Sequence, residues 1–321
     1  MRGEPRYAYL GPEGTFTEAA LRLLPETSGA VCEPLPTVRS ALDAVRSGDC
    51  FAAVVPLENS VRGVVPATLE ELISDGARLQ FDAEIELPVT FALMARPGTE
   101  IQDVRRVLSH PHAHGQCHRW LAERMPGAEV CLSTSTAAAA REIAESPLPH
   151  TRYDAAIAAP IAAARYGLSV LASRIGERRD AVTRFVSVRA TGPSPARTGR
   201  DRTSLVVTAD GARAGALVDI LAEFSTRGVG LTWIQSWPTG TALGNYHFFL
   251  DVDGHIEDAA VGDAMIALRR RAVDICFLGS YPHVGGERGR LHDSAAPAGE
   301  ASPEAWLSAL RTGEVLTAGV R

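Results

Sequence analysis

The residues best suited to chemistry in this chain lie in the segment Asp180-Ala-Val-Thr183-Arg184-Phe185, where a hydroxyl, a guanidinium and an aromatic ring are adjacent. The segment follows a run with a helical pattern and begins an apolar strand, Phe185-Val-Ser-Val-Arg. Junctions between helices and strands are where α/β proteins place many of their ligand-binding groups. The segment therefore indicates a ligand site, although a surface threonine and arginine that lead into a core strand would give the same pattern.

The elements that would position such a site are short apolar strands, each followed by a helical pattern. Four of these strands end in hydroxyl, amide or glycine residues that can cap the next helix. The four turns are 11–17, 56–60, 109–111 and 133–136. Each turn alone is explained equally well as a plain N-cap. Together they gather helix N-termini at one edge of a parallel sheet, and helix N-termini favour anions.

The anion is predicted to be a small organic acid and not a nucleotide. Gly11-Pro-Glu-Gly14 lacks the lysine and the spacing of a P-loop, and the chain has no dinucleotide-binding fingerprint. The sequence contains no lysine, which excludes Schiff-base chemistry and the anchoring of pyridoxal phosphate. A net charge of −6 gives no electrostatic footprint for nucleic acid or an anionic membrane.

The composition is that of a globular protein, with 45% hydrophobic and 22% charged residues among 321. No apolar run approaches the ~20 residues of a membrane span and no signal-peptide core is visible, so we expect a cytoplasmic protein. The five cysteines are scattered, which argues against a disulfide framework and a structural zinc site. His112, His114 and His118 have a helical spacing that suits a metal, but such histidines are more often exposed, and we predict no metal site.

Composition divides the chain into four parts. Residues 1–189 alternate strand and helix patterns, as α/β layers do. Residues 190–202 form a linker rich in Pro, Gly, Ser and Arg, and residues 203–282 predict a small α+β unit. Residues 283–321 turn to Gly, Ala, Arg and Ser, and we expect this tail to be loosely ordered.

Four motifs follow one another along the chain: Gly-Pro-Glu-Gly-Thr-Phe-Thr (11–17), Pro-Leu-Glu-Asn-Ser-Val-Arg-Gly (56–63), Ser-His-Pro (109–111) with Gln116, and Thr-Arg-Phe (183–185). Together and in this order they resemble the motifs of prephenate dehydratases. The part after the linker resembles an ACT regulatory domain through Gly215-Ala-Leu and Gln235-Ser-Trp-Pro. The resemblance covers residues 7 to about 282, which is most of the chain.

The resemblance implies an α/β catalytic domain of two lobes, similar to type-2 periplasmic binding proteins, followed by a small α+β, ferredoxin-like ACT domain. The first lobe would hold about 1–76 together with 171–189, and the second about 77–170. The implied activity is the decarboxylating dehydration of prephenate to phenylpyruvate in L-phenylalanine biosynthesis. Because aromatisation of the ring drives the loss of carbon dioxide and of the ring hydroxyl, no cofactor or metal is expected.

The resemblance also implies roles for single residues. Thr183 would assist the departing hydroxyl, with Glu58 and Asn59 as its catalytic neighbours. A threonine hydroxyl titrates far above neutral pH, so Thr183 would act as a hydrogen-bond donor and not as a general acid. Arg184 would either pair with a substrate carboxylate or brace the hinge through Glu58 or Asp180. The substrate-binding residues would be Thr15, Ser60, Ser109, Gln116, Arg184 and Phe185.

The chain departs from the family pattern at two places. Asp180 stands where the family often has Asn, and Gln235-Ser-Trp-Pro stands where the ACT domain usually reads Glu-Ser-Arg-Pro. The implied effector is an amino acid, with phenylalanine as the first candidate, and the loss of the Glu and Arg charges predicts weak or altered binding. Sheets of ACT domains pair edge to edge, which implies a homodimer or homotetramer. The effector-binding residues would be Ala214, Gly215, Ala216, Leu217, Gln235 and Ser236.

Three other functions stay open from the sequence. An arogenate dehydratase differs only in one substituent of the substrate side chain. A prephenate decarboxylase would have no need of Thr183, because it expels no hydroxide. A small-molecule sensor or binding protein on the same fold is the non-enzyme alternative, but neither a signal peptide nor a helix-turn-helix segment is visible. His110 is expected to be structural and not a proton carrier.

Overall fold

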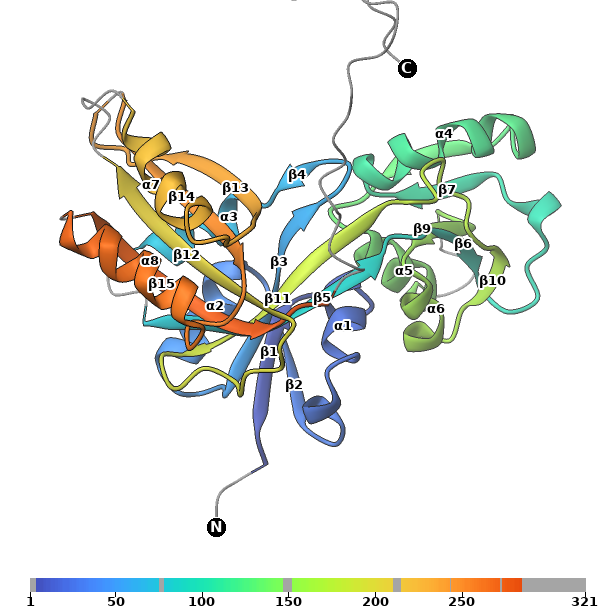
Figure 1. The fold of residues 1–321 in the computed structure, drawn as a ribbon. Helices are drawn as coiled ribbons and strands as arrows, with labels where there is room; N and C mark the ends of the chain where they lie inside the picture. The colour runs from blue at the N-terminus through green and yellow to red at the C-terminus, as the bar shows by residue number, and fades with distance from the viewer. Residues whose placement is uncertain are drawn as a thin grey trace, which may run out of the picture. The chain divides into compact units, whose positions relative to one another are not determined.

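The first lobe is built on a six-stranded sheet in which a strand from far along the chain, β11, lies between β3 and β5 (Figure 1). The computed structural model describes residues 4–74, 78–146, 152–209, 215–242, 244–271 and 273–284. The strand order is β2-β1-β3-β11-β5, and the short β4 pairs with β3. The elements are β1 (Arg6–Leu10), α1 (Phe16–Leu21), a 3-10 turn (Pro25–Thr27), β2 (Val31–Leu35), α2 (Val38–Arg46), β3 (Ala52–Asn59), β4 (Gly63–Val64), α3 (Pro66–Ile73), β5 (Leu79–Pro88) and β11 (Val182–Ala190).

The second lobe has a five-stranded sheet of the order β10-β6-β9-β7-β8. Read from its other edge, this order repeats that of the first lobe: two parallel strands, a third beside them, and then one antiparallel strand that crosses from the other lobe. The elements are β6 (Ala92–Ala95), a 3-10 turn (Ile101–Asp103), β7 (Arg106–Ser109), α4 (Pro111–Arg124), β8 (Glu129–Leu132), α5 (Thr136–Glu145), β9 (Ala155–Ala158), α6 (Pro160–Tyr166) and β10 (Ser169–Ala172).

The two connections between the lobes run side by side. The N–H of Val89 donates to the carbonyl of Ala181 at 2.7 Å, and the N–H of Ile175 donates to the carbonyl of Phe91 at 3.0 Å. Residues 173–181 contain no helix, so the expected helical run before Thr183 is wrong. The expected boundary of the second lobe near residue 77 is also wrong, because β5 pairs with β11 along its whole length and belongs to the first sheet.

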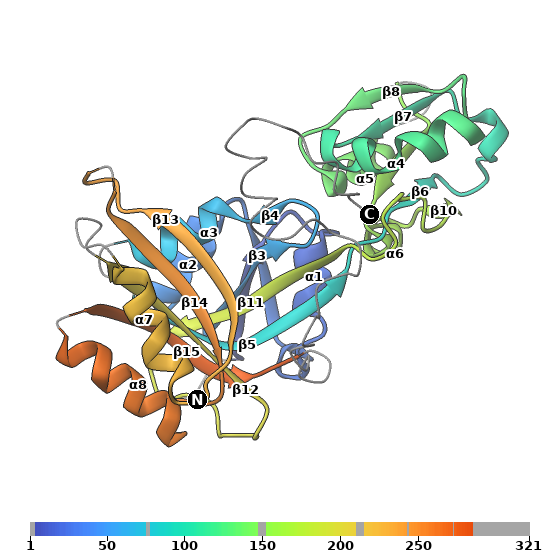
Figure 2. The same cartoon turned by 45° about the horizontal axis from the view of Figure 1, so that its top comes forward.

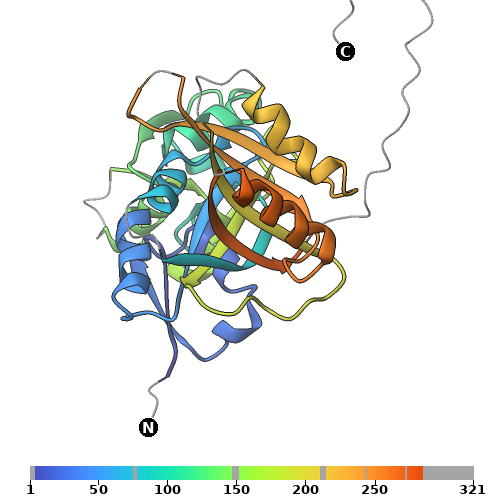
Figure 3. The ribbon, with the colours of Figure 1, turned by 60° about the vertical axis from the view of Figure 1, so that its left-hand side comes forward.

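The C-terminal unit is a four-stranded antiparallel sheet of the order β13-β14-β12-β15 with two helices on one face (Figures 2 and 3). Strand, helix, strand, strand, helix, strand in this order is the ferredoxin-like arrangement, which confirms the predicted fold class. The elements are β12 (Asp201–Ala209), α7 (Ala216–Ser225), β13 (Leu231–Pro238), β14 (Tyr246–Asp253), α8 (Ala259–Arg270) and β15 (Asp274–Pro282).

The two faces of this C-terminal sheet have different neighbours. Leu205, Val207 and Leu250 point to one face and pack under α7 and α8. Val206 and Phe249 point to the other face and share a core with residues of the first lobe. Because successive side chains of a strand alternate between faces, both faces are apolar, and the sheet is held between its own helices and the first lobe.

Gly279 marks the closest approach of the C-terminal sheet to the first lobe, and its replacement by alanine is expected to destabilise the protein. A Cβ atom at residue 279 would lie 2.3 Å from the carbonyl oxygen of Phe81, and the backbone φ of +131° is one that side chains rarely adopt. Overpacking against backbone typically costs about 1–3 kcal/mol. Urea unfolding of Gly279→Ala would measure this. Gly115→Ala is the control, because a Cβ atom at residue 115 would have no other atom within 4 Å. This substitution should leave the free energy of unfolding unchanged or raise it by up to about 1 kcal/mol. An equal effect of both substitutions would contradict the explanation.

The segments on either side of the C-terminal sheet are hydrogen-bonded to the rest of the chain. In the predicted linker the N–H of Thr191 donates to the carbonyl of Arg78, and His255 contacts the carbonyl of Pro195. The sheet begins at Asp201, two residues before the expected start. His283 and Val284 contact Glu84, whereas the rest of the predicted loose tail lies outside the described residues. Within the described part of the chain, no helix combines the length and apolarity needed to span a membrane.

Candidate active site

A cavity of about 210 Å³ lies where the two lobes and their connections meet. Thr183 and Asn59 reach it from neighbouring strands of the first lobe, and the second lobe contributes the N-terminal ends of α4 and α5. The connections between the lobes supply its apolar floor. The lining residues are Phe16, Asn59, Val89, Phe91, His110, His112, Thr134, Ser135, Thr136 and Thr183.

Asn59 holds the hydroxyl of Thr183 in one orientation. Asn59 Nδ2 donates to Thr183 Oγ1 at 2.7 Å, while Asn59 Oδ1 accepts the N–H groups of Val61 and Arg62 at 3.0 Å each. Thr183 is only 8% exposed, and its hydroxyl proton has no acceptor among the described residues. The hydroxyl therefore accepts from Asn59 and keeps its own proton for a ligand in the cavity.

The two histidines at the cavity belong to the start of α4. His110 is the N-cap, and its Nδ1 accepts the N–H of His112 at 3.2 Å. His112 Nε2 lies 2.8 Å from Gln116 Nε2, so the amide donates if that ring nitrogen is unprotonated. Burial, and then the positive charge of Arg62, lower the pKa of both histidines below the usual 6.5. Both rings are neutral at pH 7 and offer N–H groups without adding charge.

The free energy of unfolding is expected to decrease below about pH 6.5 because of these two histidines. Their folded pKa values lie below the unfolded value, so the unfolded chain takes up protons first as the pH falls. The stability present above pH 6.5 is lost as the pH decreases toward the folded pKa values. Urea unfolding between pH 7.5 and 5.5 tests this, with the His110→Asn/His112→Asn double variant as comparison. A variant that loses as much stability over this range as the wild type would contradict the assignment.

Three comparisons with known proteins bear on this site. The family model described as prephenate dehydratase matches residues 7–192, which contain the whole cavity. The prephenate dehydratase of Mycolicibacterium gilvum is 48% identical over 319 residues and covers 96% of this chain and 99% of its own length. The chain belongs to the prephenate dehydratase family. It is therefore a carbon–oxygen lyase that acts on prephenate.

Solved structures agree with this family assignment. The prephenate dehydratase of Arthrobacter aurescens, solved in complex with L-Phe, is 43% identical, covers 96% of this chain and 100% of its own, and has a TM-score of 0.80. A quorum-quenching acylase is 26% identical with a TM-score of 0.76, covering 87% of this chain and 98% of its own. The same fold thus occurs with another described activity, and the chemistry has to be argued from the residues of the site.

Of the residues expected to act in a prephenate dehydratase site, Thr183 and Asn59 line the cavity, and the other expected residues are not among its lining residues. Thr15 caps α1, where its hydroxyl accepts the N–H of Glu18. Ser60 Oγ accepts the N–H of Val182 at 3.0 Å and ties the two strands together. Ser109 is fully buried, and Gln116 stands behind His112. Glu58 is partly exposed, and its carboxylate forms no hydrogen bond or ion pair with another described residue.

Arg184 and Phe185 do not contact the cavity, and the expectation that they bind substrate is wrong for this arrangement. Arg184 points to the opposite face of β11 from Thr183, where it is 7% exposed and bonded to Glu84, Asp251 and Tyr281. Phe185 is 2% exposed and packs in the core beneath α1. Neither the Glu58 nor the Asp180 carboxylate binds the Arg184 guanidinium; Asp180 is exposed and pairs with Arg178 at 3.3 Å.

Sequence reasoning missed most of the second-lobe side of the cavity. The turn 133–136 was recognised as a helix cap but was not included in the site; its Thr134, Ser135 and Thr136 line the cavity. His110 and His112 lie at the cavity, although a structural or exposed position was expected. Val89 and Phe91 carry no sequence signal, because they reach the cavity only through the pairing of the two connections. The described residues contain no cluster of three metal-ligating side chains.

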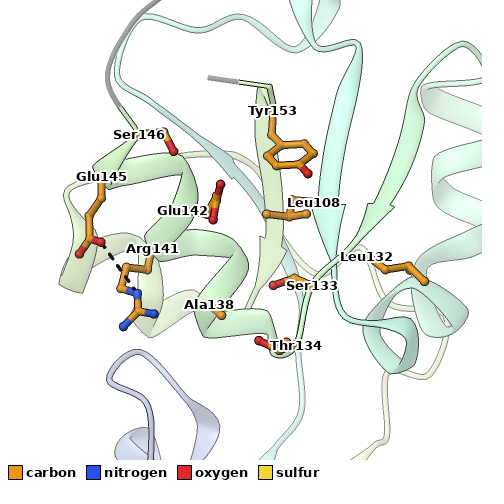
Figure 4. A pocket seen from close by; sticks show the side chains of 10 residues that line it. All are labelled: Leu108, Leu132, Ser133, Thr134, Ala138, Arg141, Glu142, Glu145, Ser146 and Tyr153. Atoms are coloured by element: carbon orange, nitrogen blue, oxygen red, sulfur yellow. Dashed lines mark ion pairs between the residues drawn. The ribbon is translucent and has the colours of Figure 1, made fainter. Parts of the chain in front are cut away.

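A larger cavity, of about 580 Å³, lies beside α5 in the second lobe (Figure 4). Glu142 and Glu145 line it, and its one arginine, Arg141, is paired with Glu145 at 3.9 Å. An acidic wall repels a substrate with two carboxylates. The smaller cavity, with its unused hydroxyl and neutral histidines, is therefore the better candidate for the prephenate site.

The residues expected to bind an effector lie on α7 and β13. Gly215 precedes α7 with a positive φ of 80°, and Ala216 and Leu217 open the helix. Gln235 and Ser236 lie on β13, which is an edge strand of the C-terminal sheet. Ala214, the sixth expected residue, lies outside the described residues.

Proposed function

We propose that this chain converts prephenate to phenylpyruvate at the 210 Å³ cavity, with Thr183 as the catalytic residue. The carboxylate on the prephenate ring leaves as carbon dioxide, and its electron pair moves through the ring to expel the hydroxyl at the opposite carbon. The Thr183 hydroxyl donates a hydrogen bond to that oxygen as negative charge develops on it. The oxygen leaves as hydroxide, which balances the charge of the lost carboxylate and is neutralised by buffer in bulk solvent. The observation that carries this proposal is the Asn59–Thr183 hydrogen bond, which leaves the Thr183 proton available.

The substrate carboxylates are proposed to bind on the second-lobe side. Thr134 and Thr136 lie at the start of α5, whose N-cap is Ser135, and unpaired N–H groups there carry partial positive charge. The neutral rings of His110 and His112 add N–H donors. Phe16 and Phe91 line the space proposed for the prephenate ring, and they contact each other edge to face with 5.6 Å between their ring centroids. Anion binding thus comes from hydroxyls and backbone, and not from Arg184.

The experiment that tests this function separates the three possible enzymes by their products. The purified chain is incubated with prephenate, and phenylpyruvate is measured by its absorbance in alkali while carbon dioxide release is measured in parallel. A dehydratase gives both in equal amounts, whereas a decarboxylase gives carbon dioxide without phenylpyruvate. Arogenate is run as the second substrate, with phenylalanine as the product. A chain that leaves prephenate unchanged and turns over arogenate would contradict the proposal, as would one that binds prephenate without reaction.

The C-terminal unit is proposed to be an ACT domain that binds an amino acid between the start of α7 and β13. Phenylalanine is the first candidate because the Arthrobacter aurescens relative, at 43% identity, was solved with L-Phe. The neutral Gln235 and Trp237 supply no ion pair at the expected interface, so we predict weak binding or a changed preference. Initial rates with millimolar phenylalanine, tyrosine or tryptophan test this. Strong inhibition that is selective for phenylalanine would contradict it.

We infer that the chain forms a homodimer or homotetramer through β13. This edge strand exposes Leu231 and Ile234, at 39% and 41%, together with unpaired backbone groups. Pairing with the same strand of a second copy would cover them. Light scattering at micromolar concentration measures the mass, and Ile234→Lys should shift it toward the monomer.

A cytoplasmic location is proposed because the substrate is an intermediate of amino-acid biosynthesis.

A further inference from the structure

Thr183 and Arg184 are consecutive residues of β11 that serve opposite faces of the sheet. Thr183 faces the cavity, and Arg184 faces the C-terminal unit. The pairing of β11 with β3 shifts register between Arg184 and Phe185, where Leu57 of β3 is the extra residue, so a bulge in β3 interrupts this ladder next to Asn59 and Thr183. A bulge disrupts the ladder locally, so the relative position of the two strands there depends more on other contacts. The contacts of Arg184 are therefore well placed to set the position of Thr183.

Every nitrogen of the Arg184 guanidinium has a partner. Nε donates to Glu84 at 2.8 Å, Nη1 to Asp251 at 2.5 Å and Nη2 to the hydroxyl of Tyr281 at 2.8 Å. The ring of Trp233 lies 5.9 Å from Cζ. A planar group held at three atoms cannot rotate or slide without breaking a charge-assisted hydrogen bond.

Two of these three partners belong to the C-terminal sheet. Asp251 lies on β14 and Tyr281 on β15, and Ser204 of β12 contacts both, at 2.5 and 2.6 Å. Asp251 is 1% exposed and Tyr281 is 0% exposed. Ser204, Asp251 and Tyr281, from three strands of the C-terminal sheet, thus form one buried polar cluster around the guanidinium of Arg184. The backbone of Arg184 lies next to Thr183 at the cavity. Buried clusters in which each member is satisfied are rigid.

We propose that Arg184 is a positioning residue through which the C-terminal sheet holds Thr183 against Asn59. The inference rests on the proposed function, and it adds that the C-terminal unit is needed for the geometry of catalysis and not only for binding an effector. Asp251 and Tyr281 are the residues that transmit this effect. Loosening either one lets β11 shift relative to β3 beside the β3 bulge and moves the Thr183 hydroxyl away from the departing oxygen.

The test uses the full chain with Asp251→Asn, which removes the negative charge but keeps the shape. We expect kcat for prephenate to decrease by about tenfold to a hundredfold, because sub-ångström to 1 Å misplacement of a reacting group has effects of this size. KM should change by less than about twofold, since Arg184 does not touch the substrate. Asp263→Asn, the same change at an exposed residue of α8, is the matched control and should leave both constants unchanged.

A double-mutant cycle separates positioning from general structural damage. If Arg184 acts through the Thr183 hydroxyl, Asp251→Asn should have little further effect on kcat in a Thr183→Ala background. An equal decrease in both backgrounds, or none in either, would overturn the inference. Tyr281→Phe removes a single hydroxyl and should give a smaller decrease with the same dependence on Thr183, so the test holds even if Asp251→Asn does not fold.

The outcome also distinguishes this inference from the proposed function. A wild-type chain that does not consume prephenate, or a Thr183→Ala variant with full activity, would refute the function and the inference together. An active wild type with an impaired Thr183→Ala variant and unimpaired Asp251→Asn and Tyr281→Phe variants would refute the inference alone.

Discussion

Thr183→Ala is expected to lower kcat for prephenate by about 10²–10³-fold while KM changes little, because the loss of one donor to developing charge has effects of this size. The hydroxyl is positioned by Asn59 at 2.7 Å, and its proton has no acceptor among the described residues. A group that contacts the departing oxygen only as charge develops contributes to the transition state and not to substrate binding. Steady-state rates of phenylpyruvate formation measure both constants.

Two further variants at residue 183 isolate the hydroxyl. Thr183→Ser keeps the donor and should retain much more activity than Thr183→Ala. Thr183→Val keeps the branched shape but has no hydroxyl, so it should be as impaired as alanine. If Thr183→Val is nearly as active as the wild type, Thr183 serves packing and the proposed mechanism is wrong.

The second large effect is expected for Glu84→Gln, which should lower the free energy of unfolding by about 3–5 kcal/mol, the usual effect of removing one partner from a buried ion cluster. Glu84 is 3% exposed, and one of its carboxylate oxygens, Oε2, contacts both Arg184 at 2.8 Å and Arg202 at 2.5 Å. His283 and the N–H of Val284 contact its other oxygen at 2.6 and 2.9 Å. A neutral amide of the same shape would remove the carboxylate that Arg202 contacts and would leave Arg184 with Asp251 as its charged partner.

The matched control lies two residues further along the same strand. The side chain of Glu86 is exposed and forms no hydrogen bond or ion pair with another described residue, so Glu86→Gln should change the free energy of unfolding by less than about 0.5 kcal/mol. Burial raises the pKa of Glu84, but Arg184, Arg202, His283 and the N–H of Val284 outweigh burial and bring it below its usual value. The contribution of Glu84 to the free energy of unfolding is therefore present above its pKa in the unfolded chain and is lost as the pH falls through its pKa in the folded protein. Glu84→Gln should lack this acid-dependent part; equal unfolding energies for both variants would contradict the role of the cluster.

The sequence predicted the first-lobe side of the site better than the second-lobe side. Thr183 and Asn59 belong to motifs whose spacing along the chain is characteristic, and pairing of β3 with β11 brings them together. The strand period of two already implies that Thr183 and Arg184 cannot face the same cavity. Phe185 is on the same face as Thr183, but it packs with Tyr9 and Leu21 under α1, which no local pattern indicates.

Taken alone, the sequence determined the family and the fold class, and it predicted the residues of the proposed reaction, because these depend on short motifs and on hydrophobic periodicity. The tertiary structure decided which side chains share a space. It placed β5 in the first lobe, brought the caps of α4 and α5 to the cavity, and turned Arg184 toward Asp251, 67 residues away in the chain. Those outcomes follow from strand order and from contacts between distant segments, and pairing across such distances leaves no mark in a local stretch of sequence.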